Sequence, residues 1–251
     1  MKKSLLIALV GAVLSSVNPV AADDGFYIVA SGAVGTKITN VPYTISSPGF
    51  YYLGLNVTYS GTGNAISVNA DNVTLDLMGF SLTGAGKSIS NCGINPNVTT
   101  TPSNNLEVRN GTVSGFNAGV VGAGANIRVS RIRAFNNAWG IWVAGDNPLI
   151  EGCISSNNDH GILVGSGRIS GCVANNNSNQ GIALNGPGAL IGNVANNNSL
   201  GFGFSDLPAP TMVDRNSASG NNTNYGVANN TKIVWGMNAG DPPHMNYPAP
   251  Y

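Results

Sequence analysis

The hydrophobic positions between Ala138 and Asn222 recur at a fixed period. Four segments begin with glycine and then alternate apolar and variable residues: Gly140–Val143, Gly161–Val164, Gly181–Leu184 and Gly201–Phe204. Their first glycines are 21, 20 and 20 residues apart. Alternation with a period of two is typical of a β-strand, so each segment predicts a short strand whose second and fourth residues face a core. In the first of these strands, Ile141 and Val143 point inward and Trp142 points outward.

Two further columns of inward residues recur once per repeat. One column contains Val129, Ile150, Ile169, Leu190 and Val213; the other takes only small residues, Ala134, Ser155, Ala174, Ala195 and Ala218. Three short strands per turn of about 20 residues describe a repeat in which each unit buries its apolar face against its neighbours. The pattern predicts an all-β fold, a single-stranded right-handed parallel β-helix of about seven coils. A leucine-rich repeat has a similar period but requires leucines that this chain lacks.

Asparagine and cysteine also occupy fixed columns. One column contains Asn137, Asn158, Asn177, Asn198 and Asn222; another contains Cys153, Cys172, Asn193 and Asn216. Asparagine tolerates a left-handed backbone in turns, and stacked amides can form a ladder of hydrogen bonds. The two cysteines should be vertical neighbours, a spacing that permits a disulfide. We expect free, buried thiols instead, because inward side chains of adjacent coils point in parallel. Cys92 is unpaired in either case.

The two ends of the chain differ from the repeat. Residues 1–22 combine two lysines, an apolar run and a Val-Ala-Ala cleavage box, which predicts a secretion signal peptide cleaved after Ala22. We expect residues 23–63 to cap the first coil, 64–236 to form the β-helix and 237–251 to be a Pro-rich tail. No later apolar run is long enough to span a membrane, so the sequence predicts a secreted protein, periplasmic or extracellular.

Composition narrows the classes of function. Only 9% of the residues are charged and the formal net charge is zero. This balance offers no basic surface for nucleic acid. The chain has no phosphate-binding loop, dinucleotide fingerprint or nucleophile elbow, and no Cys-x-x-Cys or His-rich spacing, so we expect no cofactor and no metal. Glu107 and Arg109 alternate with inward residues and predict an ion pair on the surface.

Several motifs carry a resemblance to a known superfamily. The run V-T-L-D-L-x-G at Val73–Gly79 is followed by R-N-G-T-V at Arg109–Val113 and then by the repeated G-I-x-V coils. Over roughly residues 45–236 the chain resembles secreted bacterial right-handed β-helix repeat proteins of the pectate-lyase-like superfamily. Members of that superfamily include polysaccharide lyases, hydrolases, epimerases and phage tailspikes, so the resemblance implies the fold and leaves the activity open.

One segment has a closer resemblance. Asp159-His160-Gly161-Ile162, followed by Arg168-Ile169, resembles the histidine-bearing segment of polygalacturonases. The resemblance implies that His160 is a catalytic-site histidine and that Arg168 binds a substrate carboxylate. The N-T-D and D-D motifs of that family are missing here, and Asp146 is the only aspartate in the preceding coil. Glycoside hydrolysis needs two correctly spaced carboxyl groups, so a surface histidine in an ordinary turn is the alternative.

A calcium-dependent lyase is a second enzymatic alternative. It would need an acidic cluster for Ca²⁺ and a basic residue that removes a proton from the substrate. The acidic side chains of the central coils fall singly on different coils: Asp146, Glu151, Asp159 and Asp214. Three arginines share one coil and can lie near Glu151 on the next: Arg128, Arg131 and Arg133. A solvated charge patch on the surface explains this arrangement as well as a lyase site does.

Trp139 and Trp142 are the candidate ligand-binding residues. Trp142 should face outward beside Leu163, and Trp139 should lie beside His160 in the next coil. Exposed aromatic rings can stack on sugar rings, and an apolar surface patch often marks a binding site. We expect a protein that binds polysaccharide or has a structural role in the cell envelope, without catalysis. The alternative is a lyase, hydrolase or epimerase that acts on acidic polysaccharide.

Overall fold

The computed structural model describes residues 35–96, 103–205, 210–228 and 233–236. These residues form short strands joined by turns, and the strands pair in parallel. The predicted signal peptide at 1–22, residues 23–34 of the predicted cap and the tail at 237–251 lie outside the described residues. No helix in the described part of the chain is long and apolar enough to cross a membrane.

The first sheet has nine strands in the described residues, one from each coil. The strands are β2 (Tyr43–Ile45), β5 (Gly63–Val68), β8 (Asn91–Pro96), β10 (Ala118–Ala123), β12 (Trp139–Ala144), β15 (His160–Val164), β18 (Gln180–Leu184), β21 (Leu200–Phe204) and β24 (Thr223–Val227). Each strand pairs with the strand of the coil before it and the coil after it.

The second sheet has sixteen strands in the described residues and forms two columns. The first column is β1 (Thr36–Ile38), β3 (Gly49–Leu53), β6 (Val73–Asp76), β9 (Glu107–Ser114), β11 (Arg128–Phe135), β13 (Leu149–Glu151), β16 (Gly167–Ser170), β19 (Gly188–Ile191), β22 (Thr211–Asp214) and β25 (Ile233–Trp235). The second column is β4 (Val57–Tyr59), β7 (Ser81–Gly84), β14 (Ile154–Ser156), β17 (Val173–Asn175), β20 (Val194–Asn196) and β23 (Ser217–Ser219). Strands β9 and β11 are long enough to run through both columns.

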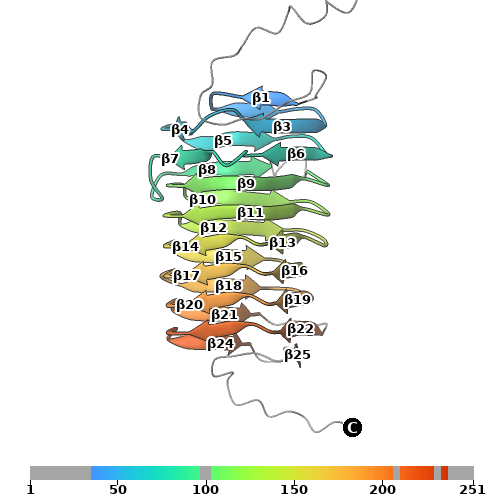
Figure 1. Cartoon of the computed structure of the whole chain (residues 1–251), viewed down its shortest axis with the longest axis vertical. Helices are drawn as coiled ribbons and strands as arrows, with labels where there is room; N and C mark the ends of the chain where they lie inside the picture. The colour runs from blue at the N-terminus through green and yellow to red at the C-terminus, as the bar shows by residue number, and fades with distance from the viewer. Residues whose placement is uncertain (1–34, 97–102, 206–209, 229–232, 237–251) are drawn as a thin grey trace, which may run out of the picture. The chain divides into compact units, whose positions relative to one another are not determined.

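The two sheets wind into a right-handed parallel β-helix, as the sequence predicts. Figure 1 shows the strands stacked above one another, from β1 to β25. A coil such as β15, β16 and β17 contributes one strand to each of the three columns. The nine strands of the first sheet indicate about nine coils, more than the predicted seven. The difference arises because β1–β4, which lie in the predicted cap, already form part of both sheets. The domain boundaries expected from the sequence stay predictions.

The inward columns are buried as predicted. Ile141, Val143 and Val164 are fully inaccessible to solvent, and Ile162 is 1% exposed. The second predicted column, from Val129 to Val213, is likewise 0% exposed throughout. Strand register stacks each of these residues on its equivalent in the next coil. The core is therefore a continuous column of aliphatic side chains, and each coil depends on its neighbours for burial.

A ladder of buried asparagines closes the coils from β12 to β24 at the turn before the first sheet. In Asn137, Asn158, Asn177 and Asn198, the backbone N–H and the side-chain amide both donate to the Oδ1 of the next member, at 2.7–3.2 Å. Each Nδ2 also donates to a backbone carbonyl of the preceding coil. The left-handed backbone belongs to the preceding residue in each turn, as at Asn157 (φ 56°) and Asn176 (φ 56°).

The last member of this ladder differs from the prediction. Asn198 donates to Asn221, not to the predicted Asn222. Asn221 lies two residues before β24, the same offset that separates Asn158 from β15. Gly220 (φ 65°) takes the left-handed position there, which shifts the ladder residue one place earlier than the asparagine pattern indicates.

The cysteine column follows the prediction of free thiols. Cys153 and Cys172 are both fully buried and unbonded to each other. The backbone N–H of Cys153 points at the Cys172 sulfur, 3.4 Å away, and the column continues with Asn193, whose Oδ1 accepts from the Cys172 N–H at 2.9 Å. A thiol therefore replaces an amide in a position that otherwise belongs to a second asparagine ladder.

The register predicts opposite outcomes for two adjacent substitutions in β15. Ile162→Asp places a charge in a dry core and should cost several kcal/mol, about enough to unfold or insolubilise the protein. Leu163→Asp should be tolerated, because Leu163 lies on the outer face and is only partly buried. Chemical denaturation of both variants checks this prediction, and equal damage at the two positions would show that the register is displaced by one residue.

The asparagine ladder makes a second prediction. Asn158→Ala removes the acceptor of two bonds from Asn137 and should lower the free energy of unfolding by about 2–4 kcal/mol. Asn157→Gly is the matched control, because Asn157 is exposed and its left-handed backbone suits glycine. Denaturant unfolding should separate the two variants. Similar losses for both would mean that turn geometry, rather than the ladder, stabilises this position.

Candidate functional site

The two tryptophans lie together with His160 on the outer face of the first sheet. Trp142 is 43% exposed, and its ring centroid lies 5.7 Å from that of Trp139. Trp139 stacks on His160 with centroids 3.9 Å apart and ring planes 3° from parallel. The strand register pairs Trp139 with His160 and Trp142 with Leu163, as predicted. We call this surface, formed by Trp139, Trp142, His160 and Leu163, the aromatic face.

The core residues and glycines beneath the aromatic face hold it in place. Ile141 and Val143 lie on either side of Trp142 and are fully buried, so β12 cannot slip without exposing them. Gly161 follows His160 at a point of close approach between coils. A β-carbon at Gly161 would lie 2.3 Å from the carbonyl oxygen of Gly181, so a larger residue would push the coils apart. The rings are therefore presented on a fixed support.

Polar side chains border the aromatic face at the start of β15. The Lys87 ammonium forms an ion pair with Asp159 at 2.5 Å, and Ser178 donates to the same carboxylate oxygen at 3.1 Å. Asn179 lies 3.3 Å from Nε2 of His160. Both members of the ion pair are exposed, with 46% and 38% of their side-chain areas accessible. Hydrogen-bonding groups thus lie directly beside the stacked rings.

Sequence analysis missed Lys87, because 72 residues separate it from Asp159. Lys87 belongs to the turn between β7 and β8, which reaches along the helix past the two coils that follow it. The carbonyl of Lys87 accepts a hydrogen bond from the Asn117 side chain at 3.3 Å. This bond holds the turn against the coil that contains Asn117. A lone lysine in a glycine-rich turn gives no signal of this contact in the sequence.

The surroundings of His160 favour the neutral form of its ring. Burial against Trp139 lowers the pKa of His160, and its hydrogen bond with Gln180 and the charge of Asp159 oppose that shift only partly. Its Nδ1 is buried and has no hydrogen-bond partner among the described residues. A neutral ring of this kind can stack on an uncharged ligand without the cost of burying a charge.

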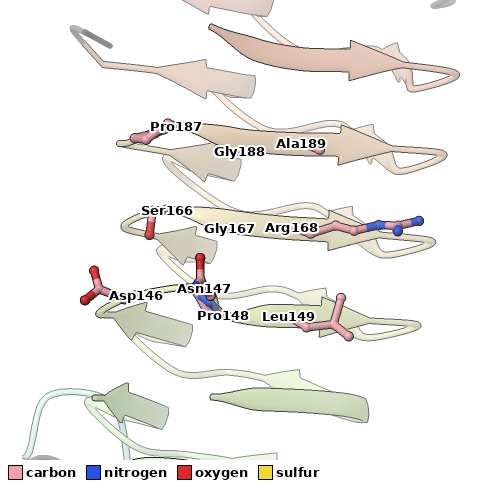
Figure 2. Close-up of a pocket in the computed structure, with 10 residues that line it drawn as sticks. All are labelled: Asp146, Asn147, Pro148, Leu149, Ser166, Gly167, Arg168, Pro187, Gly188 and Ala189. Atoms are coloured by element: carbon pink, nitrogen blue, oxygen red, sulfur yellow. The ribbon is translucent and has the colours of Figure 1, made fainter. Parts of the chain in front are cut away.

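Asp146 and Arg168 lie at a different corner of the helix. Both line an open groove of about 850 Å³ at the turns between the first and second sheets, which Figure 2 shows. The other lining residues are Asn147, Pro148, Leu149, Ser166, Gly167, Pro187, Gly188 and Ala189. Asp146 follows the end of β12, whereas His160 lies beside its start, so roughly 17 Å of strand separates them. The four catalytic candidates therefore do not converge: Asp146 and Arg168 lie away from His160, and Figure 2 shows the Arg168 side chain pointing away from Asp146.

Two of the predicted ion pairs form on the second sheet. Arg109 lies 3.3 Å from Glu107, and Arg128 lies 3.2 Å from Glu151. The structure adds a closer partner for Arg109, because its Nε donates at 2.8 Å to Asp76, whose side chain is almost fully buried. The Asp76 bond is the first cause of a raised pKa at Arg109. Asp76 also accepts from Asn110, which links β6 to β9.

The neutral state of His160 makes a testable prediction. Since the folded protein favours the neutral ring, His160 should titrate below the value of about 6.5 that is usual for histidine. The stability that the neutral ring contributes should be fully present above the unfolded-state pKa and be lost as the pH falls from there through the lower folded-state pKa. NMR titration measures the midpoint. The His160→Gln variant identifies the signal, because the chain has a second histidine, His244. A midpoint above the usual value would contradict the stacked, partly buried geometry.

Comparisons with known proteins place the fold among solved β-helices. The chain is similar to tailspike protein 2 of bacteriophage CBA120, with a TM-score of 0.58 and 16% identity over 82% of this chain and 38% of that one. It is also similar to the Dettilon tailspike protein, with a TM-score of 0.51 and 11% identity over 81% of this chain and 54% of that one. The chain thus spans less than two thirds of either tailspike. No curated protein matches it in sequence. The model of the family described as periplasmic copper-binding protein (NosD) matches residues 62–234, and the chain belongs to this family.

Proposed function

We propose that this exported protein binds polysaccharide on the aromatic face and does not turn it over. The stack of Trp139 on His160, beside the exposed ring of Trp142, is the observation that carries the proposal. The family is described as periplasmic, which agrees with the predicted export. A glycan of the cell envelope or its surroundings is therefore the ligand class that we propose.

The chemistry of the aromatic face suits a sugar ring. One face of a pyranose presents C–H groups that pack on aromatic rings, while its hydroxyl groups need hydrogen-bond partners at the edge. Trp142 supplies the platform, and the polar border offers Lys87, Asp159 and Asn179. An exposed apolar surface with a polar border is the pattern expected of a binding site.

The separation of the acidic groups favours binding over hydrolysis. Glycosidases place two carboxyl groups about 5–9.5 Å apart across the bond that they cleave. Asp159 is held by Lys87, and Asp146 lies in the groove at the other end of the strand. The described residues contain no group of three or more His, Cys, Asp or Glu side chains that could hold a metal ion, so no calcium-dependent lyase site is formed from them.

The described residues also do not fit a copper centre, although the family description names copper. Copper in proteins is bound by His, Cys and Met side chains arranged around one point. The interaction with Cys172 and burial both raise the pKa of Cys153, which keeps that thiol protonated inside the core. His160 is stacked on Trp139 on the outer surface of the first sheet, whereas both thiols are buried in the core beside the second sheet. No part of the proposed function uses a metal.

Replacement of Trp142 tests the proposal. On a glycan array, Trp142→Ala should lose retention of the glycan that the wild-type protein binds, by about tenfold or more. Its melting temperature should stay nearly unchanged, because the indole faces solvent. Met212→Ala is the matched control, since Met212 is 45% exposed but lies in the second sheet.

Three outcomes would count against this function. Retention that survives in Trp142→Ala would place the glycan elsewhere on the molecule. Release of reducing sugar or of unsaturated uronate from the retained glycan would show catalysis and favour the lyase or hydrolase alternative. A large loss of stability in Trp142→Ala would remove the aromatic face as the site.

A further inference from the structure

Two arginines of β11 lack the acidic partners that neighbouring arginines have. Arg128 pairs with Glu151, and Arg109 in the preceding coil pairs with Asp76 and Glu107. Arg131 and Arg133 are exposed, and no carboxylate lies within ion-pair distance of either among the described residues. One stretch of the second sheet therefore presents two positive charges that the described part of the protein does not neutralise.

Arg131 occupies a backbone position that does not favour arginine. Its φ is +51°, in the left-handed region, and the equivalent positions of the next coils are Gly152, Gly171 and Gly192. A side chain with a β-carbon is less favourable there than glycine, so an arginine at this turn calls for an explanation beyond backbone geometry. Arg215 is also left-handed (φ 54°), but its Nε is bonded to Asp214 at 3.0 Å.

Both guanidinium groups are anchored in the same way. Nε of Arg131 donates to Oδ1 of Asn110 at 2.7 Å, and Nε of Arg133 donates to the Thr112 hydroxyl at 3.1 Å. Both acceptors are uncharged and belong to β9, in the preceding coil. Anchoring through Nε orients each planar group and leaves its two terminal nitrogens for a ligand. The pair therefore has less rotamer freedom to lose on binding than two unattached side chains would have.

We propose that Arg131 and Arg133 form a second binding site, specific for the carboxylate groups of an acidic polysaccharide. The guanidinium fork matches a carboxylate with two parallel hydrogen bonds. The two arginines are two residues apart, which limits the separation of their backbone positions to about 7 Å, and the left-handed turn at Arg131 shortens it. Phe135 is 37% exposed and follows Arg133 on the same face of β11, and Ile154, 43% exposed, lies beside Arg133 in the next coil. These apolar groups can pack on the sugar ring that bears the acid.

Acidic polysaccharide is favoured over an anionic membrane surface by the number of charges. Adsorption to anionic lipid is typical of clusters of about 4–8 basic residues. Here only two oriented cations stand free of carboxylates in β11, and the whole chain has a formal net charge of zero. Two oriented forks suit two individual acid groups better than a diffuse negative surface. The site belongs to the second sheet and does not use the aromatic face of the first.

Matched dextrans and matched arginine variants test this site. The mature protein should bind carboxymethyl-dextran and not unmodified dextran in surface plasmon resonance, and the binding should weaken as salt is added. Arg131→Gly and Arg133→Gln should each weaken it by about fivefold or more, with the fold intact. Arg215→Gly is the control, because it makes the same change of charge at the same left-handed position, four coils away, and should leave binding unchanged.

The experiment can exclude the arginine site and leave the proposed function of the aromatic face unaffected. Equal loss in Arg215→Gly would show an unspecific effect of net charge, and no binding by the wild-type protein would exclude the site. Binding to phosphatidylglycerol vesicles but not to carboxymethyl-dextran would identify a membrane surface as the partner instead. Trp142→Ala should keep full binding to carboxymethyl-dextran; loss in that variant would mean that the acidic polymer lies on the aromatic face.

Discussion

The buried asparagine ladder is the constraint on which the rest of this helix depends. Each turn before the first sheet buries backbone N–H groups that have no partner within their own coil, and an unpaired buried group is costly. Asn158 meets that need for its neighbour: its Oδ1 accepts both the backbone N–H and the amide of Asn137, while its own Nδ2 donates to the Ala134 carbonyl. The bonds form only when successive turns lie directly above one another. The ladder therefore fixes where the coils from β12 to β24 end.

A fixed end to each coil determines what the outer surface can present. Because the turn repeats in register, the first residue of one strand lies beside the first residue of the next, which places Trp139 against His160. Inward positions are restricted to aliphatic side chains by the core, so variation between coils is free only on the outer columns. The outward column that carries Trp142 continues as Leu163, Ala183 and Gly203. The aromatic face is thus a local departure from a small and featureless surface.

The sequence was sufficient for contacts between equivalent positions and insufficient for the others. Alternation and period together place Trp139 beside His160, because strand register alone decides that contact. The contact of Lys87 with Asp159 depends on how far an irregular turn reaches along the helix, which no periodicity encodes. The ladder at Asn221 was misplaced by one residue because two adjacent asparagines fit the pattern, and only the left-handed glycine before them decides between the two. The sequence suggests Asp146 as a carboxylate for a site at His160 because the two residues lie in successive coils. It does not show that they lie at opposite ends of the first-sheet strands.

The separation of buried inward residues from exposed outward residues explains why the fold and the family do not determine the ligand. A coil can exchange any outward residue without loss of core packing or of the ladder, so the helix can persist while its surface chemistry changes. In this chain the exchanges yield stacked rings on one sheet and two anchored guanidinium groups on the other. The stacked rings depart from what their column otherwise contains, and Arg131 lies at a left-handed backbone position where the next three coils have glycine. The repeat does not require these outward residues, and the helix tolerates them at some cost in stability. In a solenoid, such positions are therefore the first candidates for ligand binding.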